Sequence, residues 1–171
     1  VNGSTIIEAG DDLFFLATEE NMRFMSELSK NQSRIENIMI AGGGRVGSAL
    51  AKKLESIYNL KLIEKDKHIA KQVSQELLST VVLNNDIADE SLLTNENINE
   101  VDYFCAVTNN DQMNILSAKL AKDMGAKKTI AIVNKSSYRN LVSKEIDIVV
   151  SPEDVTIGSL LASVRTSDIV N

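Results

Sequence analysis

Three closely spaced glycines are the residues of this chain whose type and spacing most clearly predict a chemical role. Gly42, Gly44 and Gly47 have the spacing G-x-G-x-x-G, between a short apolar run and a segment with helical periodicity. Glycine at these positions allows a tight turn, close approach of the backbone to a pyrophosphate, and close packing of the following helix. The first N–H groups of that helix would bind the phosphates. The pattern predicts a dinucleotide-binding loop that also includes Gly43, Arg45 and Val46.

Polar side chains after later apolar runs extend this predicted site. Glu64 ends the next run, where a carboxylate can accept hydrogen bonds from ribose hydroxyls and would repel a 2′-phosphate. Asp86 follows the third run, where adenine would lie. Thr108 and Asn109 follow the fourth and could bind the phosphates or the second ribose. The alternatives are that the glycines form only a tight turn, and that these polar residues are ordinary loop and cap residues.

The elements that must position these residues alternate regularly between strand and helix from residue 35 onward. This alternation predicts an α/β fold, a three-layer Rossmann-like parallel sheet with helices on both faces. Strands are expected at 38–41, 60–63, 81–83, 103–107, 129–133 and 146–150. Helices are expected at 45–57, 67–77, 111–124 and 138–142, and after Pro152 with Asp154 as the cap. A polar, acidic connection is expected between the third and fourth strands.

The residues before the sheet have a different character. The first stretch contains two short β-type runs around a Gly10-Asp11-Asp12 turn, then a helical pattern over 18–28 and a polar linker. We expect residues 1–33 to be the tail of a preceding small regulatory domain with its linker, a β-hairpin and helix remnant. Residues 34–171 would form the nucleotide-binding domain, and the chain would be part of a longer protein.

Composition excludes several classes of function. The chain of 171 residues has a formal net charge of −6, which disfavours a nucleic-acid partner. Its single cysteine, Cys105, cannot form an internal disulfide and fits a reducing cytosol. No apolar run approaches the ~20 residues needed to cross a bilayer.

The residues offer little support for catalysis. The lone histidine, His68, follows the second strand on the adenosine side, and no tyrosine has a lysine four residues later. Cys105 lies within a strand, where a buried inert thiol is expected. We therefore expect no catalytic residues and no metal site. Two alternatives remain open: an NAD-dependent oxidoreductase fragment lacking its substrate domain, and a structural module that has lost its ligand.

The sequence resembles the TrkA-type regulators of bacterial potassium uptake, which contain RCK-type nucleotide-binding domains. The likeness rests on the segments IMIAGGGRVGSAL, LKLIEKD, NNDIADESLL and IDIVVSP, and above all on Thr108, Asn109, Asp111 and Asn114 within VTNNDQMN. It is best to the second Rossmann half of such regulators, over about residues 34–171. Two departures are Asn85, where many relatives have glycine, and Ile132, where many have arginine.

The resemblance implies properties that composition could not indicate. Family members bind NAD or NADH, or in relatives ATP and ADP, and assemble as dimers or higher rings beneath an integral-membrane potassium transporter subunit. The protein would then be cytoplasmic, peripheral to the inner face of the membrane. Carried over by position, the phosphate loop is Gly42 to Gly47, the ribose acid is Glu64, and Thr108 with Asn109 lines the later edge. In the last helix, Ile157, Leu160, Leu161 and Val164 form an apolar stripe that would contact a second copy or pack against its own sheet.

Overall fold

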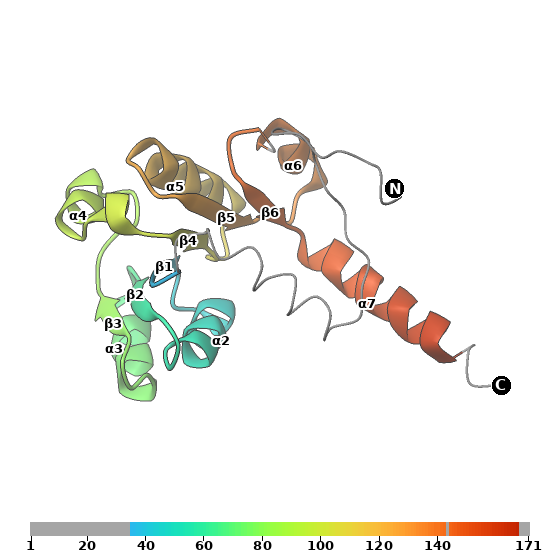
Figure 1. Cartoon of the computed structure of the whole chain (residues 1–171), viewed down its shortest axis with the longest axis horizontal. Helices are drawn as coiled ribbons and strands as arrows, with labels where there is room; N and C mark the ends of the chain where they lie inside the picture. The colour runs from blue at the N-terminus through green and yellow to red at the C-terminus, as the bar shows by residue number, and fades with distance from the viewer. Residues whose placement is uncertain (1–34, 143, 168–171) are drawn as a thin grey trace, which may run out of the picture. The chain divides into compact units, whose positions relative to one another are not determined.

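Six parallel strands form one sheet in the order β3-β2-β1-β4-β5-β6 (Figure 1). The computed structural model describes residues 35–142 and 144–167. The expectations for residues 1–33 lie outside the described residues. The strands are β1 (Asn37–Ala41), β2 (Asn59–Ile63), β3 (Val81–Leu83), β4 (Tyr103–Ala106), β5 (Lys128–Ile132) and β6 (Ile148–Val150). The predicted Rossmann-like parallel sheet is confirmed.

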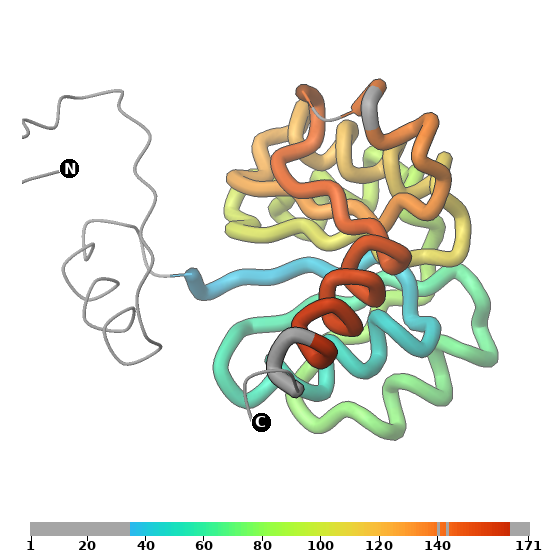
Figure 2. Tube along the Cα trace, turned by 90° about the vertical axis from the view of Figure 1, so that its right-hand side faces the viewer, coloured from blue at the N-terminus to red at the C-terminus, as the bar shows by residue number. Residues whose placement is uncertain are grey.

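Helices connect successive strands. They are α2 (Arg45–Leu54), α3 (Lys67–Glu76), α4 (Glu90–Asn95), the 3-10 helix η1 (Ile98–Glu100), α5 (Asp111–Asp123), α6 (Ser136–Val142) and α7 (Pro152–Ser167). Both views place α2 and α3 on the opposite side of the central strands from α5 and α6 (Figures 1 and 2).

Alternate residues of the central strands serve two separate cores. In β1, Met39 and Ala41 pack with residues of α4 and α5, whereas Ile38 and Ile40 pack with residues of α2 and α3. β4 repeats the pattern with Phe104 on the first side. Burial on both faces explains why these strands are continuous apolar runs instead of alternating ones.

One helix was not predicted. A polar, acidic connection with no helix named in it was expected between β3 and β4, but the connection contains α4 and η1. The Asp89 carboxylate accepts hydrogen bonds from the amides of Ser91 and Leu92 at the start of α4. Leu92 and Leu93 are buried. Six residues are too few to show the helical periodicity on which the prediction relied.

The last helix begins differently from the prediction. Asp154 was expected to cap α7, but Asp154 lies within the first turn and its amide donates to the Ser151 hydroxyl at 3.3 Å. Ser151 therefore caps the helix and Pro152 occupies its first position, where proline is favoured. Figure 1 shows α7 leading away from β6. The side chains of its apolar stripe (Ile157, Leu160, Leu161 and Val164) are 48–62% exposed. The stripe therefore does not pack against the sheet.

Candidate nucleotide-binding site

The glycine loop connects β1 to α2. Gly42 has a backbone φ of +110°, which residues with a side chain rarely adopt. Its amide donates a hydrogen bond to the Ile63 carbonyl at 2.8 Å. Gly44 is the N-cap of α2 and provides no side-chain cap. It is exposed, and a Cβ added there would meet no atom within 4 Å. The loop thus leaves open space directly before the amino terminus of a helix, the arrangement that suits an anion.

Gly47 holds α2 against its own loop. A Cβ at this position would lie 1.8 Å from the Gly42 carbonyl oxygen and 3.2 Å from Cγ2 of Val107. Only glycine fits there without displacement of the backbone. Arg45 and Val46 follow on the exposed side of α2, and Val46 is 53% exposed.

Glu64 ties the end of β2 to the glycine loop. Its Oε2 accepts a hydrogen bond from the Gly43 amide at 2.7 Å, and its Oε1 accepts one from the Asp66 amide at 2.8 Å. The side chain is half-buried. Because each carboxylate oxygen has a second lone pair, the group can still accept hydrogen bonds from ligand hydroxyls.

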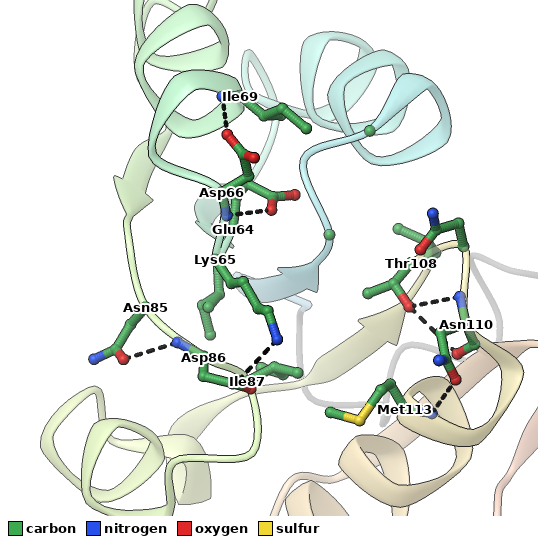
Figure 3. Close-up of a pocket in the computed structure, with 15 residues that line it drawn as sticks. Glu64, Lys65, Asp66, Ile69, Asn85, Asp86, Ile87, Thr108, Asn110 and Met113 are labelled. Atoms are coloured by element: carbon green, nitrogen blue, oxygen red, sulfur yellow. Dashed lines mark hydrogen bonds and ion pairs between the residues drawn. The ribbon is translucent and has the colours of Figure 1, made fainter.

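A cavity of about 430 Å³ lies at the carboxyl edge of the sheet (Figure 3). Among the predicted residues that line it are Gly42, Gly44, Glu64, Asp86, Thr108 and Asn109. Gly43, Arg45, Val46 and Gly47 belong to the adjoining loop and helix and do not line it. In open parallel sheets, ligand-binding clefts form at this edge where the strand order reverses, which here is between β1 and β4.

Several lining residues were not predicted. They are Ile63, Lys65, Asp66, Ile69, Asn85, Ile87, Val107, Asn110 and Met113. Most of them are next to a predicted residue in the sequence, so their position close to a strand end could have identified them as lining residues. Ile69 and Met113 lie inside helices, and only the packing of those helices against the cleft brings them in.

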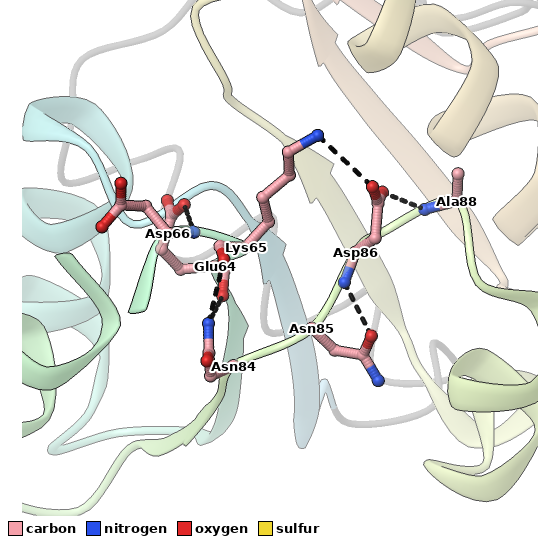
Figure 4. A network of polar contacts seen from close by, with 7 residues as sticks. All are labelled: Glu64, Lys65, Asp66, Asn84, Asn85, Asp86 and Ala88. Carbon is pink, nitrogen blue, oxygen red and sulfur yellow. Dashed lines mark hydrogen bonds and ion pairs between the residues drawn. The ribbon is translucent and has the colours of Figure 1, made fainter. Parts of the chain in front are cut away.

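An ion pair joins the ends of the neighbouring strands β2 and β3 on one side of the cleft (Figure 4). Lys65 Nζ lies 3.4 Å from Asp86 Oδ2. The pKa of the Asp86 carboxyl is lowered, chiefly by a hydrogen bond from the Ala88 amide and also by the charge of Lys65. The Asn85 side-chain oxygen accepts a hydrogen bond from the Asp86 amide at 2.8 Å. The carboxylate is therefore held ionised at this end of the cleft.

The other reactive side chains considered in the sequence lie outside the cleft lining. Cys105 is buried in β4, and burial raises the pKa of its thiol to about 11. His68 is exposed in the first turn of α3, where its amide donates to Asp66. Within 35–142 and 144–167, no group of three or more His, Cys, Asp or Glu side chains is arranged to hold a metal ion.

A glycine loop, a helix amino terminus and an acid at the end of β2 together define a Rossmann domain of the nucleotide-binding type. The chain belongs to the TrkA-N domain family, whose model matches residues 38–152. The Trk system potassium uptake protein TrkA of Vibrio alginolyticus is 48% identical over 171 residues, which cover 99% of this chain. The chain spans 37% of the length of that relative.

Solved structures share the fold. The TrkA-N domain of the inner membrane protein ybaL from Escherichia coli has a TM-score of 0.67 at 17% identity, with 76% of this chain and 97% of that chain covered. The GsuK channel bound to NAD has a TM-score of 0.60 at 18% identity, with 71% and 22% covered. GsuK has also been solved bound to ADP, with a TM-score of 0.61 at 24% identity over 75% of this chain and 34% of that one.

Proposed function

We propose that this domain binds NAD or NADH, or an adenine nucleotide such as ATP or ADP, as the regulatory unit of a potassium uptake system. The observation that carries the proposal is the pairing of the Glu64 carboxylate with the Gly43 amide beside the uncapped start of α2. This pairing puts a ribose acceptor and a phosphate-binding helix terminus next to each other, as a dinucleotide requires.

The residues of the cleft fit such a ligand part by part. The pyrophosphate would contact the backbone at Gly44, and the ribose hydroxyls would be held by Glu64. The apolar side chains of Ile69 and Ile87 line the end where adenine would lie. Thr108 and Asn109 line the opposite end, where the second half of a dinucleotide would extend.

The charged and polar residues that line the cleft fit nucleotide binding better than catalysis of hydride transfer. Lys65 is the one cation among the described residues that line it, and it is paired with Asp86 at the adenosine end. A hydride-transfer enzyme needs an acid or base at the nicotinamide end, which is lined by Thr108, Asn109 and Asn110. The proposed role is therefore ligand sensing, not oxidoreduction.

The regulatory step would be a change in how Rossmann units are oriented. A ligand shifts such an equilibrium only by binding the two arrangements with different affinity. The cleft is built from loops that follow four strands, so different nucleotides would contact these loops unequally. The exposed apolar face of α7 would pair with a second copy, and the assembly would act on an integral-membrane potassium transporter from the cytoplasmic side. None of the described helices is long and apolar enough to cross a membrane.

Calorimetric titration with NADH, NAD, ATP and ADP tests the proposal directly. Gly44→Ala is the informative variant, because its φ of −67 and open surroundings allow alanine in the folded state. The added methyl group would occupy the space needed by the pyrophosphate, and affinity should fall about tenfold or more. Gly158→Ala in α7 is the matched control, because a Cβ there also meets no atom within 4 Å. Absence of binding to the unmodified chain would contradict the proposal, as would unchanged affinity in Gly44→Ala.

A further inference from the structure

Asn114 is a fully buried side-chain amide near the start of α5. Its Oδ1 accepts from the Thr108 amide at 2.9 Å and from the Thr108 hydroxyl at 2.6 Å. Its Nδ2 donates to the carbonyls of Thr108 at 3.0 Å and Ile132 at 2.9 Å. All four hydrogen-bonding positions of the amide are used, so its burial carries no desolvation penalty from an unpaired group.

These bonds begin where the sheet ends. Directly after β4, the Val107 amide still donates to the Ala41 carbonyl at the end of β1. Beyond it, Thr108 has no neighbouring strand to bind its backbone, and Asn114 supplies both the acceptor and the donor. The Ile132 carbonyl fixes the amide in turn to the end of β5. Asn114 therefore fixes the first residue of the loop after β4 to the end of the sheet through hydrogen bonds.

The position of Thr108 matters because it borders the glycine loop. A Cβ at Gly42 would lie 3.0 Å from both the amide nitrogen and Cγ2 of Thr108. The Thr108 hydroxyl oxygen also accepts from the Asn110 amide at 3.2 Å. A movement of Thr108 would therefore change both the width of the cleft beside Gly42 and the course of the 108–110 loop.

The cleft has two sides (Figure 3). One carries Glu64, Asp66 and Asp86, which follow β2 and β3, and the other carries Thr108, Asn110 and Met113. An adenine mononucleotide needs only the first side and the glycine loop. A dinucleotide crosses to the second side at the reversal of strand order.

We propose that Asn114 is a positioning residue that makes the cleft selective for a dinucleotide over an adenine mononucleotide, by holding Thr108 and the 108–110 loop in place. This inference rests on the proposed nucleotide binding. Asn114 itself does not line the cleft, and it acts through Thr108. Loss of its amide leaves the Glu64 side intact and loosens the side used by the second nucleotide half.

The test compares NADH with AMP as probes by calorimetric titration of the full 171-residue chain. Asn114→Ala removes all four bonds. Thr108→Val, a gentler change of similar shape, removes only the hydroxyl that donates to Asn114 and accepts from Asn110. Ser117→Ala is the matched control, because Ser117 is a buried polar residue of the same helix whose hydroxyl bonds only within α5. Thermal unfolding of each variant shows whether it is folded at the temperature of titration.

Asn114→Ala and Thr108→Val should weaken NADH binding about tenfold while AMP binding changes less than about twofold. Ser117→Ala should leave the ratio of the two affinities unchanged. If the unmodified chain binds both probes but the variants weaken both equally, or weaken neither, the positioning role is overturned and the proposed function stands. If the unmodified chain binds neither probe, the proposed function itself fails, and this inference with it.

Discussion

The Oε2 atom of Glu64 and the amide nitrogen of Gly43 are 2.7 Å apart, so the second strand and the glycine loop form one hydrogen-bonded unit. A Cβ at Gly43 would lie 3.1 Å from Cβ of Glu64, which shows how closely the two segments approach. The acid that would bind the ribose is thus held by the loop that would bind the phosphates. The groups that would bind the ribose and the diphosphate of a nucleotide are therefore fixed relative to each other before any ligand binds.

Replacement of Glu64 by glutamine should alter both affinity and selectivity. Glutamine keeps only one of the two acceptor oxygens, so either the Gly43 amide or the Asp66 amide loses its hydrogen-bond acceptor. The substitution also removes the negative charge that would repel a 2′-phosphate. NADH affinity should fall about tenfold, and the preference for NADH over NADPH should shrink. Titration of Glu64→Gln with both nucleotides measures this, with Glu76→Gln on the exposed face of α3 as control. An unaltered preference would remove the ribose assignment.

Gly47→Ala should damage the fold as well as the site. The alanine Cβ would lie 1.8 Å from the Gly42 carbonyl oxygen, so either α2 or the loop must move. Overpacking of a close backbone contact costs about 1–3 kcal/mol or more. Urea denaturation should show this loss of unfolding free energy in Gly47→Ala, whereas Gly44→Ala should unfold like the unmodified chain. Equal stability of all three proteins would mean that the contact is readily relieved.

The strands could be predicted because they are apolar runs separated by helices, and glycines with a following acid mark the edge used by a ligand. The packing of α5 does not follow from its apolar spacing. Met113, Leu116, Leu120 and Met124 fall on one side at helical spacing, yet Leu116 is 54% exposed.

The buried residues of α5 are smaller, namely Asn114, Ser117, Ala118 and Ala121, whereas Met113, Leu120 and Met124 pack against the same core and stay partly exposed. Close packing of a helix on a sheet favours small side chains. The resemblance singled out Asn114, but its burial and its four hydrogen bonds to Thr108 and Ile132 are visible only in the structure. The hydrogen bonds of Asn114 could therefore not be predicted from periodicity, nor could the ion pair between Lys65 and Asp86.

Asp102 should make the stability of the domain sensitive to acid. Burial acts to raise the pKa of this carboxyl, but hydrogen bonds from the amides of Asn37 and Glu36 and from Lys127 outweigh it and lower the pKa from 3.8 to about 2. Because the folded pKa lies below the unfolded value, the stabilisation is present above about pH 4 and is lost as pH falls through about 2. The corresponding free energy is about 2 kcal/mol.

Urea denaturation between pH 7 and pH 2 checks this expectation. Asp102→Asn should be less stable than the unmodified chain at pH 7, and the difference should shrink towards pH 2. Asp123→Asn, at a carboxylate that is 65% exposed, is the control. A stability difference between Asp102→Asn and the unmodified chain that stays constant with pH would show that the carboxylate contributes no such linkage.

The apolar face of α7 should determine self-association. Val155, Ile157, Leu160, Leu161 and Val164 are each about half exposed or more, and burial of such a stripe against a second copy would stabilise a dimer by roughly 25 cal/mol per Å² of apolar surface. Leu161→Asp places a charge in the middle of that face, where its desolvation would oppose association.

Light scattering should therefore show a smaller species for Leu161→Asp than for the unmodified chain. Leu116→Asp in α5 is a matched control, because Leu116 is 54% exposed and Leu161 is 52% exposed. If the face is the contact, only the α7 variant dissociates. A dimer or larger mass shared by both variants and the unmodified chain would mean that copies meet elsewhere, and the proposed coupling from nucleotide to neighbouring unit would then have to pass through a different element. A monomer mass for the unmodified chain would contradict the predicted self-association.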